Sequence, residues 1–251
     1  RACAGVYAPD SHNDDMRLYE DEIIVLRTMK LGEADRIITA LGRSHGKIRA
    51  VAKGVRKPTS RFGGRLEPFM VVTCQFRKGR SLDIISSAVT SRPYADAIAR
   101  DYGRFRAGTV VLETADRLSQ AEPSLSLYLL LRGAVGALAR GAHDPELIRD
   151  SFTLRALAAA GWGLELSRCV QCGAEGEWLM LAPLLGGVLC DTCRPAGALS
   201  LSGGSRDLLV ALASGNWDVA DESVPADRLV VSGIVATYLQ NVIEHRINSL
   251  G

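Results

Sequence analysis

The chain has 251 residues, of which 47% are hydrophobic, so it can bury a sizeable core and divide into two or three units. Its longest apolar runs are four or five residues, whereas a helix that crosses a bilayer needs roughly twenty, so we expect no transmembrane helix. The formal net charge is only +2, but residues 17–92 hold sixteen Lys and Arg against seven Asp and Glu, an excess that attracts polyanions.

The first fifteen residues, Arg1–Asp15, contain neither the apolar stretch nor the cleavage pattern of a secretory signal. We expect an unstructured extension there, followed by a folded domain that begins at Met16. Four of the six cysteines form two close pairs, a pattern that suits a metal in a reducing cytoplasm better than a secreted disulfide framework, so we expect a cytoplasmic protein.

Five segments between residues 22 and 90 have the composition of β-strands and are separated by turn residues. We predict strands at Glu22–Arg27, Arg36–Leu41, Lys47–Lys53, Pro68–Arg77 and Leu82–Thr90. Five strands with a long loop between the third and fourth favour a small closed barrel. The oligonucleotide-binding (OB) fold is the leading candidate for residues 16–92, because its five-stranded barrel binds nucleic-acid strands. Cys74, in the fourth predicted strand, is expected to be a buried small hydrophobe and not a reactive thiol.

The stretch from Arg43 to Arg65 carries eight cations and no acidic residue. Its first half alternates polar and apolar residues, as a half-buried strand does. From Gly54 to Gly64 it is rich in cations, glycine and turn residues, which indicates a mobile surface loop. A strand that leads into such a loop places charges where a polyphosphate backbone can run. The sequence therefore predicts a nucleic-acid site, although most basic runs are simply solvated surface.

The candidate nucleic-acid contacts fall into two sets. The loop supplies the main candidates, which are Lys53, Arg56, Lys57, Arg61 and Arg65. The preceding turn and strand supply the secondary candidates, which are Arg43, Lys47 and Arg49. Phe62 is the aromatic residue of the loop, and its ring could stack on a base or could instead pack on the barrel.

After Pro93 the apolar period changes from two residues to three or four, as in helices. We predict helices at Tyr94–Ser119, Ser124–Arg140, Pro145–Ala160, Ser205–Ala213 and Pro225–Asn248. Asp144 and Pro145 have the chemistry of a helix start. The first helix is expected to bury a face that includes Tyr102 and Phe105, and the last a face that includes Leu229. These faces are typical of core, although one groove between them could accept a partner's short peptide.

Four of the six cysteines form two close pairs, whereas Cys3 and Cys74 lie far from them. Each pair has two residues between its cysteines, and seventeen residues separate the pairs, which is typical of four-thiolate zinc. We predict one structural Zn²⁺, since four thiolates fill its tetrahedron and leave no open position; iron–sulfur or redox chemistry is the alternative. The ligands would be Cys169, Cys172, Cys190 and Cys193.

The predicted zinc module spans residues 166–198, with Gly173 allowing a tight fold after the first pair and with a short hairpin at Trp178–Leu181 and Gly187–Leu189. The module is inserted into a helical domain, residues 93–251. In order, these elements predict an α+β multidomain protein: an N-terminal five-stranded OB-fold barrel, then an α-helical domain with an inserted four-cysteine zinc-binding module.

Three stretches resemble the amino-terminal barrel of the RecO family of bacterial recombination mediators: LGEADRIITAL, HGKIRAVAKGVRKPTSRFGGRLEPF and LDIISSAV. The later CxxC…CxxC and the closing helix are similar to that family's helical carboxyl-terminal part. The resemblance covers Met16 to Leu250 and is strongest over Leu31–Phe69. Arg1–Asp15 matches nothing in the family pattern.

The resemblance implies a DNA repair protein that is not an enzyme. Members bind single- and double-stranded DNA and anneal strands coated with single-strand-binding protein. With a RecR partner they help RecA replace that protein at gaps and breaks, so the expected partners are DNA, RecR, the carboxyl-terminal tail of single-strand-binding protein and, indirectly, RecA. The expected location is the bacterial nucleoid.

Two other classes of function are compatible with a barrel and a zinc module. An RNA-binding or translation-associated protein would prefer RNA to DNA of equal length. A zinc-dependent nucleic-acid deaminase would need an H-x-E sequence and an open metal position. His143 is followed by Asp144 and Pro145, so the sequence does not favour a deaminase.

Overall fold

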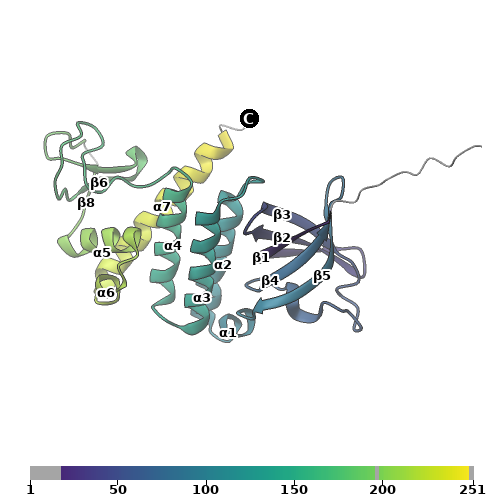
Figure 1. The fold of residues 1–251 in the computed structure, drawn as a ribbon. Helices are drawn as coiled ribbons and strands as arrows, with labels where there is room; N and C mark the ends of the chain where they lie inside the picture. The colour runs from purple at the N-terminus through teal and green to yellow at the C-terminus, as the bar shows by residue number, and fades with distance from the viewer. Residues whose placement is uncertain (1–17, 196–197, 249–251) are drawn as a thin grey trace, which may run out of the picture.

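The computed structural model describes residues 18–195 and 198–248, so the predicted extension Arg1–Asp15 and the expected start at Met16 lie outside the described residues. The molecule is elongated (Figure 1). A closed β-barrel lies at one end, a layer of helices lies in the middle, and a small sheet with the cysteine pairs lies at the other end. The predicted fold class is confirmed.

The barrel contains the five predicted strands, and the first is longer than predicted. They are β1 (Leu18–Leu31), β2 (Asp35–Gly42), β3 (Gly46–Ala52), β4 (Val71–Arg77) and β5 (Asp83–Arg92). The strand order is β1-β2-β3-β5-β4. The contact between β3 and β5 is parallel and short, and it closes the barrel, while the other pairs are antiparallel.

Strand β1 contributes to two cores because successive side chains of a strand point to opposite faces. Ile23 and Val25 lie in the barrel core, whereas Ile24 and Leu26 lie in the core of the helical layer. Phe69 also packs into the helical core, with the unusual backbone angle φ 71°. A Cβ on Gly108 of the facing helix would lie 2.8 Å from the Phe69 ring, so glycine is needed for this close approach. The barrel and the helices are therefore joined by continuous apolar packing.

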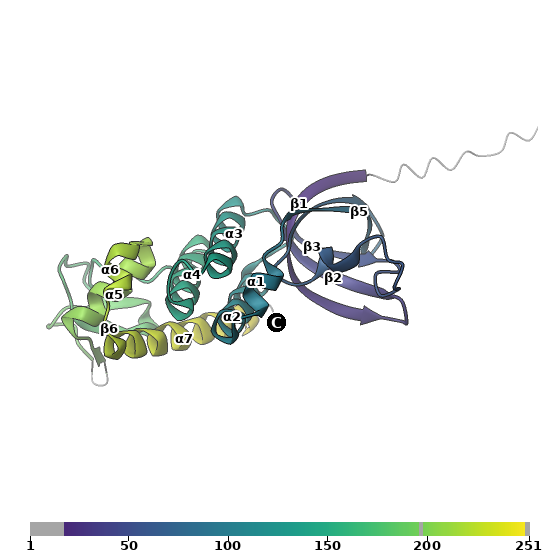
Figure 2. The same cartoon turned by 90° about the horizontal axis from the view of Figure 1, so that it is seen from below.

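The helical part contains seven helices in the described residues. They are α1 (Ala95–Ala99), α2 (Tyr102–Leu118), α3 (Leu125–Arg140), α4 (Pro145–Ala159), α5 (Gly203–Ser214), α6 (Trp217–Asp221) and α7 (Pro225–Asn248). Figure 2 shows α7 running from the cysteine-rich end of the molecule to α2. None of the helices in the described chain is long and apolar enough to cross a membrane.

The single helix predicted at Tyr94–Ser119 is wrong, because Asp101 breaks it. The Asp101 side chain caps α2 by accepting a hydrogen bond from the backbone N–H of Arg104. This restart also rotates the buried face, so Tyr102 and Phe105 are 78% and 46% exposed. Leu229, predicted on the buried face of α7, is 77% exposed. The predicted start of α4 is confirmed, with Asp144 as the cap and Pro145 in the first turn.

The cysteine module lies between α4 and α5. Its predicted hairpin is confirmed as β6 (Met180–Ala182) and β7 (Gly187–Leu189), and a short third strand, β8 (Leu199–Ser200), pairs with β6. Leu181 and Val188 pack into the same core as α5 and α7. The module is therefore attached to the helices and far from the barrel (Figure 1).

Candidate nucleic-acid interface and metal site

Five of the seven carboxylates in residues 18–92 are used inside the fold. Asp21 accepts hydrogen bonds from the backbone N–H groups of Ser44 and His45, Asp35 from that of Gly54, and Asp83 from that of Gly79. Glu67 forms an ion pair with Arg36 at 2.6 Å, and Glu22 accepts a hydrogen bond from the Tyr128 hydroxyl at 2.7 Å. Only Glu20 and Glu33 remain exposed without such a partner among the described residues. The oxygens of these carboxylates therefore face donors within the fold, and the cations of residues 18–92 still outnumber the acidic side chains by fifteen to seven.

The predicted cations are mostly exposed and without acidic partners. In the described chain, no ion pair with a carboxylate involves seven of the eight, which are Arg43, Arg49, Lys53, Arg56, Lys57, Arg61 and Arg65. Arg56 and Arg65 donate hydrogen bonds to the carbonyl oxygens of Gly32 and Arg61, which leaves their charges uncompensated. Exposed, uncompensated cations are the groups that bind phosphates.

Lys47 differs from the other seven candidates. Its Nζ atom lies 2.6 Å from Oδ1 of Asp116 in α2, and Arg27 lies 2.8 Å from Oδ2 of the same carboxylate. Burial raises the pKa of Asp116, but the hydrogen bonds from Lys47 and Arg27 outweigh this effect and lower it. Lys47 thus fastens the barrel to the helices instead of facing solvent. The sequence could not reveal this pair, because 69 residues separate its members.

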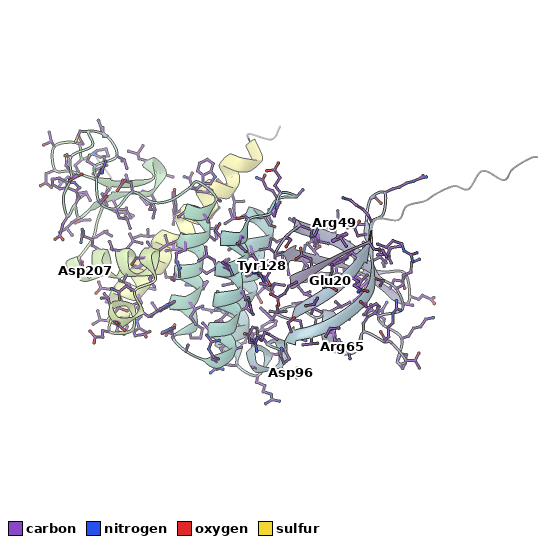
Figure 3. All side chains as sticks on the ribbon, in the orientation of Figure 1. Glu20, Arg49, Arg65, Asp96, Tyr128 and Asp207 are labelled. Carbon is purple, nitrogen blue, oxygen red and sulfur yellow. The ribbon has the colours of Figure 1, made fainter. Side chains whose placement is uncertain are left out.

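The outer face of β2 is not open to a ligand, although OB folds commonly bind strands over their second and third strands. Leu41 points outward from β2 into the helical core, and Thr39 is 2% exposed. The helices therefore occupy part of the usual binding face. Figure 3 shows Arg49 and Arg65 on the barrel, far from Asp207 in α5. A nucleic acid must use the barrel surface that the helices leave free.

The basic stretch is divided between the two ends of the barrel. The loop that carries Lys53–Arg65 is tied to the β1–β2 turn, because Arg56 N–H donates to the Ala34 carbonyl. Arg43 N–H donates to the Glu22 carbonyl near the other end of β1. Leu31 lies nine positions after Glu22 in β1, at most about 30 Å along an antiparallel strand. We call the two ends the loop end and the hairpin end.

The loop is more firmly held than a mobile surface loop, and Phe62 is the reason. Its side chain is 1% exposed and belongs to the barrel core, with the Arg61 guanidinium 5.0 Å from the ring centroid. The ring cannot meet a base in this arrangement, so the alternative of packing on the barrel holds. Leu66, in the short 3-10 helix η1 (Gly63–Leu66), is a second buried anchor.

A second group of cations, which we did not predict from the sequence, lies at the end of β4 and in the turn that leads to β5. Arg77, Lys78 and Arg80 are exposed and have no acidic partner among residues 18–195 and 198–248. Gly79 is required at the centre of this turn, because a Cβ there would collide with the Leu82 carbonyl oxygen. In the sequence, this group could have been recognised from three cations within the four residues 77–80.

The four paired cysteines come together as predicted. Their Sγ atoms all lie within 4.8 Å of one another, and those of Cys172 and Cys190 are 3.7 Å apart. A tetrahedral ion with metal–sulfur bonds of about 2.3 Å requires sulfur atoms about 3.8 Å apart. Gly173 has φ 75°, and its N–H donates to the Cys169 carbonyl at 2.8 Å. The cysteines therefore form a site that could hold one metal ion.

The thiols of this site have different acidities. Burial raises the pKa of Cys169, but hydrogen bonds from the backbone of Cys190, Cys172 and Gln171 outweigh burial and lower it to about 6. The neighbouring thiols of Cys190 and Cys172 raise the pKa of Cys193 to about 12. Cys74 is fully buried in the barrel, where burial raises its pKa to about 12, so the prediction of a buried small hydrophobe is confirmed.

Comparison with known proteins covers both parts of the chain. The family model for the recombination protein O N terminal matches residues 16–94, and that for the recombination protein O C terminal matches residues 99–251. The DNA repair protein RecO of Thermobifida fusca is 47% identical over 237 residues, which cover 94% of this chain and 98% of that protein. Those of a Nocardioides species and of Frankia casuarinae are each 48% identical, over 93% and 94% of this chain and 98% of each relative.

Proposed function

This chain belongs to the RecO family of DNA repair proteins, and from that premise we propose that it is a recombination mediator without catalytic activity of its own. It binds single- and double-stranded DNA, anneals strands coated with single-strand-binding protein and, with RecR, promotes RecA loading in gap and break repair. Its place of action is the cytoplasm, at the nucleoid.

The distribution of charge on the barrel carries this proposal. Internal hydrogen bonds and ion pairs use most of the carboxylates, whereas the loop cations face solvent without acidic partners. Such a surface binds the phosphate backbone of DNA and does not read the bases, because contacts with phosphates carry no sequence information. A mediator that must act at any gap needs this kind of binding.

The salt dependence of binding tests the role of the loop. The five loop cations, Lys53, Arg56, Lys57, Arg61 and Arg65, should contribute about −3.5 to the slope of log K against log salt with single-stranded DNA, at about −0.7 for each contact. Replacing Arg56 and Lys57 with Ala should make the slope less steep by about 1.4 and weaken every sequence alike. Fluorescence anisotropy over a salt series measures both effects.

A matched variant controls for the loss of charge. Arg100→Ala/Arg117→Ala removes two exposed cations from the helical part, and it should leave the slope within the error of the wild-type value. An unchanged slope and affinity in the loop variant would remove the loop from the DNA site. Tighter binding to RNA than to DNA of equal length would favour an RNA-binding protein instead.

We infer that the metal of the cysteine site is zinc and that its role is structural. Cys169, Cys172, Cys190 and Cys193 would hold one ion and fill its tetrahedral coordination. The surrounding core is small, since among the described residues its buried members are Met180, Leu189 and two of the cysteines. So small a core does not fold without the ion.

We further infer that the tail of single-strand-binding protein docks on the helices and not on the loop. A groove of about 450 Å³ between α3, α4 and α6 has an apolar floor that includes Leu129, Phe152 and Trp217. Arg140 and Arg155 also line it, and neither forms an ion pair in the described part of the chain. The groove therefore suits a peptide that is both apolar and acidic.

Substitutions at the two surfaces separate these possibilities. Lys53→Ala/Arg56→Ala/Lys57→Ala should retain its affinity for the tail peptide, whereas Arg140→Ala/Arg155→Ala should lose about tenfold or more, because charge-assisted contacts contribute about 1.5–3 kcal/mol each. Titration calorimetry with the isolated peptide measures both affinities. If the triple variant loses tail binding while it stays folded, the loop is the receptor and this assignment is wrong.

A further inference from the structure

Three aromatic rings form a row at the hairpin end of the barrel. Phe76 is fully buried in the barrel core, and the Tyr19 ring stacks on it with centroids 4.9 Å apart and an angle of 16°. The His45 ring lies next to the Tyr19 ring, with the two ring centroids 4.4 Å apart. The side chain of His45 is 44% exposed. The row thus begins in the core and ends at a ring that solvent can reach.

The His45 ring is held in place by a buried carboxylate. Its Nδ1 atom lies 3.0 Å from Oδ2 of Asp21, whose side chain is 2% exposed. Because a carboxylate only accepts, Nδ1 carries the hydrogen, and Nε2 remains free. Asp21 also accepts hydrogen bonds from the backbone N–H groups of Ser44 and His45, so the turn is fixed independently of the imidazole.

Cations lie in the two chain reversals that Tyr19 and His45 connect, between β2 and β3 and between β4 and β5. Tyr19 links the ring to the β4–β5 turn, since its hydroxyl donates to Asp83, which also accepts the N–H of Gly79. Both oxygens of the one carboxylate in the turn are therefore used inside the fold. Arg77, Lys78 and Arg80 in that turn are exposed, as is Arg43 beside His45.

We propose that the hairpin end is a second contact site for single-stranded DNA, in which a base stacks on the outer face of His45 while Arg43, Arg77, Lys78 and Arg80 bind the flanking phosphates. An exposed ring bordered by cations is the arrangement with which OB folds hold single strands. His45 takes the stacking role that the buried Phe62 cannot fill. This inference rests on the proposed function, and it extends the DNA path beyond the loop end.

The two ends lie close enough for one DNA strand to contact both of them. At most about 30 Å of β1 separates them, and the strand length bound by one OB fold, about 4–16 nucleotides, can cover such a distance. Arg49, exposed on β3, lies between the two ends because it pairs with Thr39 in the middle of β2. A strand held at both ends would keep its bases exposed for pairing.

An abasic strand separates stacking from phosphate binding. His45→Ala should weaken binding of an ordinary single-stranded oligonucleotide about fivefold or more, since a base–aromatic stack contributes at least about 1 kcal/mol. It should not change the affinity for an abasic oligonucleotide of the same length. His45→Phe should restore most of the loss, and Lys78→Ala/Arg80→Ala should weaken both strands and lower the salt slope by about 1.4.

His143 provides a matched control. It stacks on Trp217 with centroids 4.0 Å apart and pairs with Asp221 at 2.7 Å, but it lies in the helical part. His143→Ala should leave binding of both strands unchanged. Thermal melting confirms that each variant is folded.

Two results would overturn the inference: equal affinity of His45→Ala and wild type for the ordinary strand, or equal losses on the ordinary and abasic strands. A wild-type protein that binds neither strand would instead overturn the proposed function. If only the loop variant weakens binding, the loop end remains the DNA site and the hairpin end does not belong to it.

Discussion

Replacing Cys169 and Cys172 with Ser is expected to abolish metal binding and to lower the melting temperature strongly. The double variant keeps only two of the four thiolates, and a structural Zn²⁺ needs all four. Metal binding contributes about 10–16 kcal/mol in small zinc peptides, where it is the driving force for folding. Here the damage should spread from the module to the helices, because Leu181 and Val188 pack with α5 and α7.

The DNA affinity of the folded fraction should change little, since the barrel has its own core at the other end of the molecule. Metal content is measured by mass spectrometry of the purified protein, and stability by thermal unfolding. Cys74→Ala is the matched control, because it removes a buried cysteine that is not near the site. It should keep the metal. If metal-free wild-type protein is as stable as metal-bound wild-type protein, the metal has no structural role.

Phe62→Ala is expected to destabilise the protein by about 3–5 kcal/mol, the usual cost of deleting a buried aromatic side chain. The ring fills the barrel core, and its neighbours cannot close the cavity completely. The loop would lose its anchor, so the loop cations would become more mobile. Urea unfolding measures the change, which should shift the midpoint without changing the slope of the unfolding free energy.

Tyr102→Ala is the control for Phe62→Ala. Tyr102 is an aromatic side chain that is 78% exposed, and surface substitutions usually change stability by no more than about 0.5 kcal/mol. If Phe62→Ala is as stable as Tyr102→Ala but loses DNA affinity, the ring leaves the core to meet a base, and the account of a fixed loop is wrong.

Features with local causes were predictable from the sequence. The strands follow from alternation and turn residues, and the metal site follows from the spacing of its cysteines. The start of α4 follows from Asp144 and Pro145. Each of these signals lies within a few residues of the feature that it determines, so no tertiary contact was needed to find it.

What the sequence could not predict has a different cause. Lys47 was predicted to face a phosphate, but Asp116 of a distant helix binds it. The sequence left open whether Phe62 stacks on a base or packs on the barrel, and the structure places it in the barrel core. The contacts of His45 with Asp21 and Tyr19 of β1 could not be foreseen either, because more than twenty residues separate them along the chain. Whether a polar or aromatic side chain is free depends on residues far along the chain, which periodicity cannot identify.

Annealing in the presence of single-strand-binding protein tests most directly whether the barrel surface pairs DNA strands. Complementary strands are coated separately with that protein, mixed with the chain, and followed by the fluorescence of a dye pair. We expect faster annealing with the wild type and a slower rate with Arg56→Ala/Lys57→Ala, because this variant loses two phosphate contacts while both substituted side chains are exposed, so the fold should persist. No acceleration by folded, metal-loaded wild-type protein would contradict this expectation.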